Sequence, residues 1–196
     1  MGKRKYIDKI EGLFKRSPVV YMDSISRIVK SEKKVKQYNK QLIRNLILSS
    51  RIKRLTKGCY TIHNDIALTV FCFKPAYLGL QDALSAHNLW EQESIPVIVT
   101  TRKVRQGIRK VLGANILIRR INKKYFFGFK YKKQGNFYLP ISDIEKTFID
   151  MIYFKEKLSG ELMGNCRKII NKKKLMMYAK RYPNNIHLKI VSLFNS

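Results

Sequence analysis

The stretch VKQYNKQLIRNLILSSRIKRLTKGCYTI, residues 35–62, decides the fold of the first part of this chain. Its first half places apolar residues at helical spacing, so that they form one broad face. These residues are Val35, Tyr38, Leu42, Ile43, Leu46 and Ile47. Its second half holds two strand-like runs, 52–55 and 59–62, joined by a short turn in which Gly58 supplies the positive φ that a tight loop needs. The pattern predicts a long amphipathic helix followed at once by a β-hairpin.

The opposite face of this helix is formed by long polar side chains. They stand one helical turn apart in two neighbouring rows, with Lys36, Lys40 and Arg44 in one row and Gln37 and Gln41 in the other. Arginine can bind guanine, glutamine can bind adenine, and lysine binds phosphates. A polar helix face is often only a solvated face. The interpretation of this face as a DNA-binding surface therefore depends on the elements around it.

The elements before and after the long helix complete a known pattern. We expect a first helix over 6–16, a second helix over 23–30 that begins after Asp23, and a polar turn over 31–34. With the hairpin, whose tip carries Lys57, residues 1–74 have the element order of a winged helix-turn-helix domain. A bundle of unrelated helices is the alternative, but it would leave the hairpin unexplained.

The composition of the chain points to an anionic partner. The 196 residues include 41 Lys and Arg against 13 Asp and Glu, which gives a formal charge of +28. Such an excess destabilises a compact protein by self-repulsion unless a polyanion is near, so it favours nucleic acid or an acidic protein as partner. A content of 45% hydrophobic residues excludes a wholly disordered chain. We expect no membrane contact and a cytoplasmic location, because the sequence has no long apolar run and no apolar signal core.

The residues that could bind a metal or a cofactor are scattered. Cys59, Cys72 and Cys166 lack zinc-ligand spacing, and the three histidines are isolated. We therefore expect reduced thiols, no metal site and no cofactor. The sequence also lacks a phosphate-binding loop and a nucleophile elbow, so no enzymatic activity is expected.

The second half of the chain, residues 75–196, predicts a mixed domain with a small sheet and flanking helices. Residues 80–89 suit a helix that ends at Asn88 in a left-handed conformation. Runs typical of strands follow at 97–101, 115–121, 125–131 and 137–139. Helices are expected around 175–179 and from about residue 185, whereas the period of 63–74 is ambiguous between strand and helix.

A helix with a clear start signal lies at 142–157. Ser142 and Glu145 form a capping box, in which each side chain bonds the other residue's amide. Asp143, Glu145 and Lys146 could also suggest a two-carboxylate nuclease. Capping explains these residues better, because Lys146 directly follows Glu145 and the Glu-x-Lys spacing is absent.

Four segments together resemble the AbiEi antitoxins, which are winged-helix proteins of type IV toxin–antitoxin, or abortive infection, systems. The segment LILSSRIKRLTKGCYTI resembles the wing of that family. In the second half, YLGLQDALSAHNLW, YFFGFK and ISDIEKTFIDMIYF are similar to a helix, a strand and a second helix of its C-terminal domain. The resemblance covers roughly residues 20–155.

The resemblance implies a protein with two activities. Its N-terminal domain would bind double-stranded DNA at inverted repeats in its own promoter and act as a repressor. Its C-terminal domain would counteract a nucleotidyltransferase-like toxin. The DNA contacts implied are Lys36, Gln37, Lys40, Gln41 and Arg44 on the helix, and Lys53, Arg54 and Lys57 on the wing. Two alternatives stay open, a stand-alone transcriptional regulator whose second domain senses a ligand or dimerises, and a metal-dependent nuclease.

Overall fold

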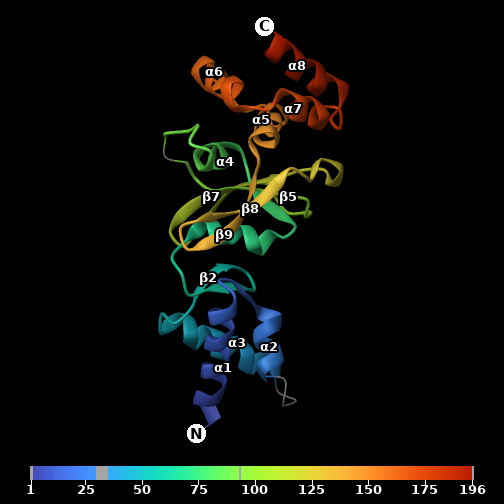
Figure 1. The fold of residues 1–196 in the computed structure, drawn as a ribbon. Coiled ribbons are helices and arrows are strands. Elements are labelled where there is room, and N and C mark those ends of the chain that lie inside the picture. Colours follow the sequence, from blue (N-terminus) through green and yellow to red (C-terminus); the bar gives the residue numbers. More distant parts are fainter. Residues whose placement is uncertain (1, 30–34, 93, 196) are drawn as a thin grey trace. The chain divides into compact units, whose positions relative to one another are not determined.

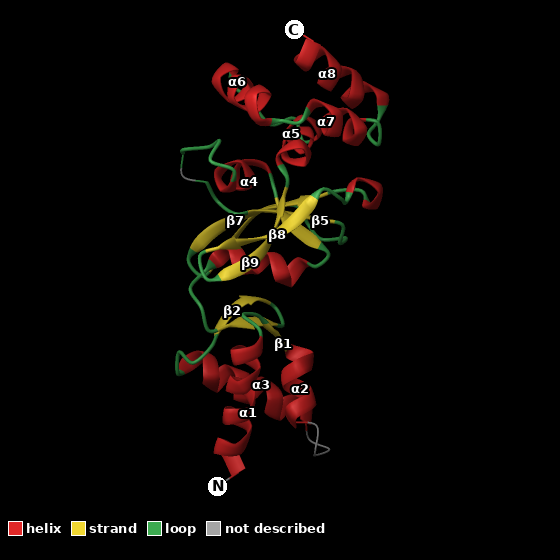
Figure 2. Ribbon diagram, viewed as in Figure 1, coloured by secondary structure: helices red, strands yellow, loops and turns green. Residues whose placement is uncertain are grey.

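The computed structural model describes residues 2–29, 35–92 and 94–195 (Figures 1 and 2). The chain divides into two compact units, Met1–Cys72 with Lys110–Ala114, and Phe73–Arg109 with Asn115–Ser196. The sequence predicted the boundary at 74/75, whereas the division falls between Cys72 and Phe73 and assigns Lys110–Ala114 to the first unit. Both units contain helices and strands, so the α+β class predicted from the sequence is confirmed.

The described part of the first unit consists of three α-helices, a 3-10 helix and a small sheet. Its elements are α1 (Gly2–Arg16), β1 (Val20–Tyr21), α2 (Met22–Val29), α3 (Val35–Leu48), β2 (Lys53–Thr56), β3 (Cys59–Thr61) and η1 (Ile66–Phe73). The sheet is antiparallel in the order β1-β3-β2, with Val20 opposite Tyr60 and Lys53 opposite Thr61. Gly58 has φ +79°, so the turn predicted between β2 and β3 is confirmed. The predicted polar turn over 31–34 lies outside the described residues.

Apolar side chains of all three helices form the core of the first unit. The buried residues include Ile10, Phe14, Ile25, Val29, Leu42, Ile43, Leu46 and Ile52. From α3 the buried members of the predicted apolar face are Leu42, Ile43 and Leu46, whereas Tyr38 is 38% exposed and the side chain of Val35 lies outside the described residues. α1 ends at Arg16, because Ser17 precedes Pro18 and the residue before a proline avoids helical geometry. The order of three helices followed by a hairpin is that of a winged helix-turn-helix domain.

One sequence prediction for this unit was wrong. Cys59 and Cys72 are joined in a disulfide, with their Cα atoms 6.0 Å apart, whereas reduced thiols were expected. The return strand of the hairpin and the following 3-10 helix bring the two residues together, and a separation of 13 residues along the chain does not reveal this. Cys166 is free and buried, and burial raises the pKa of its thiol to about 11.

The second unit is built on a mixed sheet with helices. Its strands are β4 (Ala76–Leu78), β5 (Val97–Thr100), β6 (Gly107–Val111), β7 (Ala114–Arg120), β8 (Phe129–Gln134) and β9 (Phe137–Ser142), in the order β6-β7-β5-β4-β9-β8. Its helices are α4 (Leu80–Ala86), η2 (Lys123–Tyr125), α5 (Ile144–Tyr153), α6 (Gly160–Ile169), α7 (Lys172–Ala179) and α8 (Asn184–Asn195). The pairs β4·β9 and β5·β7 are parallel, whereas β4·β5 and β8·β9 are antiparallel.

Several local predictions for this unit need correction. The aromatic strand expected over 125–131 begins only at Phe129, because Gly128 adopts φ +70° and breaks the extended chain. The capping box is also absent. The N-cap of α5 is Asp143, whose carboxylate accepts a bond from the Lys146 amide, while the Glu145 carboxylate bonds residues of the α7 region. The left-handed Asn88 after α4 is confirmed by its φ of +57°.

Candidate nucleic-acid interface

The exposed side of α3 carries the polar residues that the sequence predicted. Lys40, Gln41 and Arg44 are exposed, and Leu42 and Leu46 on the opposite side are buried. The side chains of Lys36 and Gln37 lie outside the described residues, although both positions fall within α3. The structure therefore shows that three of the five predicted helix residues are accessible on the surface of the helix.

One buried polar residue of α3 was not predicted. Asn39 is only 2% exposed and donates from Nδ2 to Ser26 Oγ over 3.2 Å. This hydrogen bond joins α3 to α2 through a polar contact. Because a buried amide is costly without a partner, this bond helps to fix the position of the exposed side of α3 relative to α2.

The three predicted residues of the wing differ in their surroundings. Arg54 on β2 is exposed, and its Nε donates to the Thr56 carbonyl over 3.4 Å. Lys57 is exposed at the tip of the turn. Lys53 is half-buried, and its ammonium group contacts the side-chain oxygen of Asn64. Arg54 and Lys57 are thus available to a ligand, while Lys53 already has a partner.

The helix and the wing meet along a groove of about 300 Å³. Its cationic residues are Lys40 and Arg44 from α3 and Arg54 from β2, and its apolar residues are Met22, Ile43, Ile47, Leu48 and Tyr60. Among the described residues no acidic side chain lines this groove. Three cations without a nearby carboxylate create a positive potential, which attracts a polyanion.

Gln41 belongs to a different depression of the first unit. It lies beside Asn45, to whose Oδ1 its amide donates over 3.2 Å, and both line a hollow with Tyr38 and Arg51. Arg51 is paired with Glu11 over 2.8 Å. The structure therefore brings Lys40, Arg44 and Arg54 together, but it separates Gln41 from this group.

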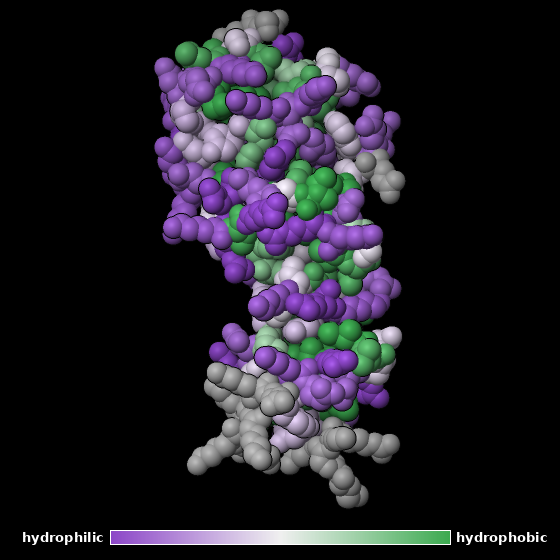
Figure 3. Space-filling view, turned by 180° about the vertical axis from the view of Figure 1, so that it is seen from behind, coloured by the Kyte–Doolittle hydropathy of each residue, from purple (hydrophilic) through white to green (hydrophobic). Residues whose placement is uncertain are grey.

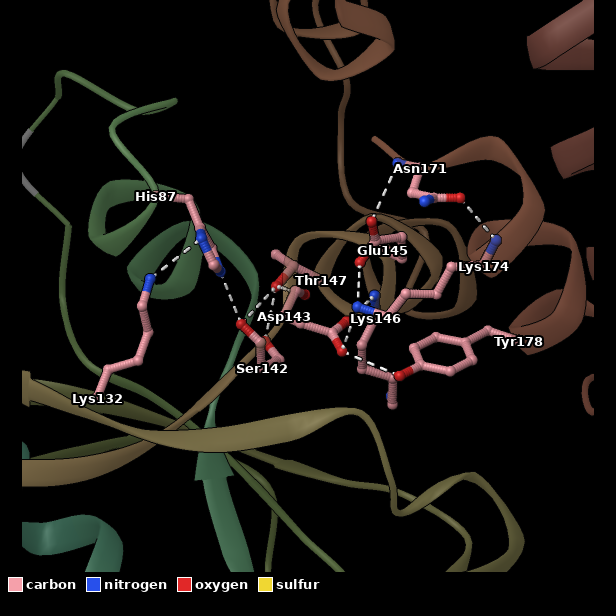
Figure 4. A network of polar contacts seen from close by, with 10 residues as sticks. All are labelled: His87, Lys132, Ser142, Asp143, Glu145, Lys146, Thr147, Asn171, Lys174 and Tyr178. Atoms are coloured by element: carbon pink, nitrogen blue, oxygen red, sulfur yellow. Dashed lines mark hydrogen bonds and ion pairs between the residues drawn. The ribbon is translucent and has the colours of Figure 1, made fainter. Parts of the chain in front are cut away.

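The carboxylates considered for a nuclease serve as structural contacts at the start of α5 (Figure 4). Asp143 accepts bonds from Tyr178 and from Lys174, each over 3.0 Å. Glu145 accepts from the Asn171 amide over 3.0 Å and from Lys174 over 2.7 Å. Among the described residues no group of three His, Cys, Asp or Glu side chains could hold a metal ion.

These contacts shift the ionisation of both partners. Burial alone would raise the pKa of Glu145, but the bonds from Lys174 and Asn171 outweigh it and lower the pKa. For Lys174, partial burial opposes the charged form, yet the bonds to Glu145 and Asp143 raise its pKa to about 12. Both groups are therefore held in their charged forms as an ion pair, which explains their presence without a catalytic role.

A second polar cluster lies inside the second unit and was not predicted. The ammonium group of Lys146 is fully buried and contacts Asp150 and, over 2.8 Å, the hydroxyl of Tyr77. Asp150 also accepts bonds from Tyr77 over 2.7 Å and from Tyr182 over 3.0 Å. Burial lowers the pKa of Lys146 and raises that of Tyr77, so the tyrosine hydroxyls remain donors. The spacing of Lys146 and Asp150, four residues apart on a helix, was the signal in the sequence.

Polar side chains cover most of the face seen in Figure 3, as the excess of cationic residues requires. None of the described helices is both long and apolar enough to cross a lipid bilayer.

Comparison with known proteins shows solved structures of similar fold. The crystal structure of the RV2827C protein from Mycobacterium tuberculosis superposes with a TM-score of 0.64 over 97% of this chain and 76% of that chain, at 12% sequence identity. The fold is shared. At this identity the likeness concerns the fold alone. No family model and no curated protein matches the sequence.

Proposed function

We propose that this protein is a DNA-binding antitoxin and transcriptional autorepressor. The groove between α3 and the wing carries the proposal, because it gathers Lys40, Arg44 and Arg54 around an apolar floor without an acidic side chain among its described residues. A DNA strand presents phosphates to such cations and the less polar deoxyribose to such a floor. The protein would act in the cytoplasm, at inverted repeats in its own promoter.

In this proposal α3 enters the major groove and the wing contacts the adjacent backbone or minor groove. Arg44 lies on the accessible side of α3, where its guanidinium can bind guanine or a phosphate. Lys57 at the tip of the turn is placed for a phosphate contact, which adds affinity without sequence preference. The overall charge of +28 supports association with the duplex at a distance.

A gel-shift titration with the DNA upstream of the protein's own reading frame tests this part of the proposal. Arg44→Ala should weaken binding by about 1–3 kcal/mol if the guanidinium reads a base. Arg51→Ala is the matched control, because it removes the same charge in the same unit from a residue outside the groove that is paired with Glu11. Unchanged affinity of Arg44→Ala, or an equal loss in both variants, would exclude α3 as the recognition helix.

The antitoxin role of the second unit rests on the resemblance of its segments to the AbiEi family. It predicts that the neighbouring reading frame encodes a nucleotidyltransferase-like toxin. The test is co-expression of that frame, from an unrelated inducible promoter, with the full chain. Growth should be rescued by the wild type and equally by Lys40→Ala combined with Arg44→Ala. Rescue that disappears in the double variant would show that neutralisation depends on the groove of the first unit.

A further inference from the structure

Leu48 is an apolar residue in an unexpected place. It is the last residue of α3 and is 72% exposed. It follows Lys40 and Arg44 at intervals of four residues, so it continues the cationic row along the same side of the helix. Leu46 of α3 is buried in the core of the first unit, and the neighbouring Ile47 packs against that core. Core packing therefore does not account for the position of Leu48.

Leu48 lines the same groove as the three cations of the candidate interface. A single exposed leucine is common on protein surfaces and needs no explanation by itself. Here, however, the side chain stands beside Arg44 and Arg54, in the groove proposed to receive DNA. The apolar group that a duplex presents in its major groove is the 5-methyl group of thymine.

We propose that Leu48 recognises a thymine through its 5-methyl group, and so makes the protein selective for thymine at one position of its binding site. This inference rests on the proposed DNA binding. One helical turn between Arg44 and Leu48 advances about 5.4 Å along the helix, and successive base pairs lie about 3.4 Å apart. If α3 follows the direction of the major groove, the thymine lies one or two base pairs from the base or phosphate that Arg44 contacts.

Replacement of thymine by uracil tests the inference at the level of one methyl group. The DNA upstream of the protein's reading frame is prepared with thymine or with uracil throughout, and the affinity of the full-length protein is measured on both duplexes. Burial of one methyl group contributes about 0.8 kcal/mol, so the wild type should bind the uracil duplex about fourfold more weakly for each methyl contacted. Leu48→Ala should bind both duplexes equally.

Two controls separate a methyl contact from other effects of uracil. Leu48→Met keeps an apolar side chain and should retain the preference for thymine. Ile108→Ala removes another strongly exposed aliphatic residue, which is 66% exposed on β6, and should also retain it. Equal affinity of the wild type for both duplexes would overturn the inference, as would a preference for thymine that persists in Leu48→Ala. If the wild type binds neither duplex, the proposed function itself fails, and the inference fails with it.

Discussion

Replacement of Lys146 by methionine should strongly destabilise the second unit. The side chain of Lys146 is 0% exposed, and its ammonium group contacts Asp150, the Tyr77 hydroxyl and the face of Phe127. Methionine fills a similar volume, so the substitution removes the charge with little change in packing. What remains is a buried carboxylate without a cation.

The size of the loss follows from the bonds that survive. Removal of one partner of a buried ion pair costs about 3–5 kcal/mol. In Lys146→Met the Asp150 carboxylate keeps the hydroxyl bonds from Tyr77 and Tyr182, so we expect a loss of about 3 kcal/mol. In Asp150→Asn the buried ammonium loses the carboxylate that it contacts and keeps Tyr77, so we expect a loss of about 5 kcal/mol. Combining Lys146→Met with Asp150→Leu removes both charges but leaves the Tyr77 and Tyr182 hydroxyls without their acceptor, so the double variant should lose less stability than the sum of the two single losses.

Urea denaturation followed by fluorescence measures these losses in the correct unit. The sequence contains one tryptophan, Trp90, which packs against the core of the second unit, so its emission reports unfolding there. Lys130→Met is the matched control, because the same substitution at an exposed position of β8 should change stability by less than about 0.5 kcal/mol. An unfolding midpoint of Lys146→Met equal to that of the control would refute this reasoning, as would a double variant that loses the sum of the single losses.

Three further predictions concern other parts of the molecule. Because the folded-state pKa of Glu145 is lowered, its stabilising effect is present above the pKa of the unfolded chain and is lost as pH falls through the folded value. Glu145→Gln should thus lower the free energy of unfolding by about 1–3 kcal/mol at pH 7 and weaken its dependence on pH in acid, both measurable by urea denaturation at several pH values. Gly128→Ala should cost about 2–5 kcal/mol in thermal or urea denaturation, since φ is +70° and the new methyl would lie 2.9 Å from Lys146 Cβ and 3.0 Å from Tyr178 Cε2. Wild-type stability of this variant would contradict that packing. Lys57→Ala should weaken binding to all duplexes alike and lower the slope of log affinity against log salt by about 1, which salt titrations of specific and shuffled DNA can check.

The elements that depend on local geometry could be predicted from the amino-acid sequence alone. The 3.6-residue period of apolar side chains predicted α3 and its buried residues Leu42 and Leu46, and Gly58 predicted the turn of the wing. Both signals arise within a few residues, because helical spacing and turn conformation are set by the backbone of neighbouring positions. The same helical spacing predicts the exposed cations of α3, because they lie on the side of the helix opposite its buried apolar residues.

The contacts between distant segments were decided by the tertiary structure. The Tyr77 hydroxyl contacts Asp150, which lies 73 residues away, because β4 and α5 pack in one unit. No local sequence pattern at either residue predicts this contact. The disulfide between Cys59 and Cys72 and the short strands β4 and β6 depend in the same way on segments brought together by folding. The exposure of Leu48 is a further case. The helical period predicts on which side of α3 Leu48 lies, but the packing of the core and the position of the wing determine that this side is exposed to solvent. The local pattern of a segment predicts which of its side chains are buried. Which buried surfaces pack against one another depends on the tertiary fold.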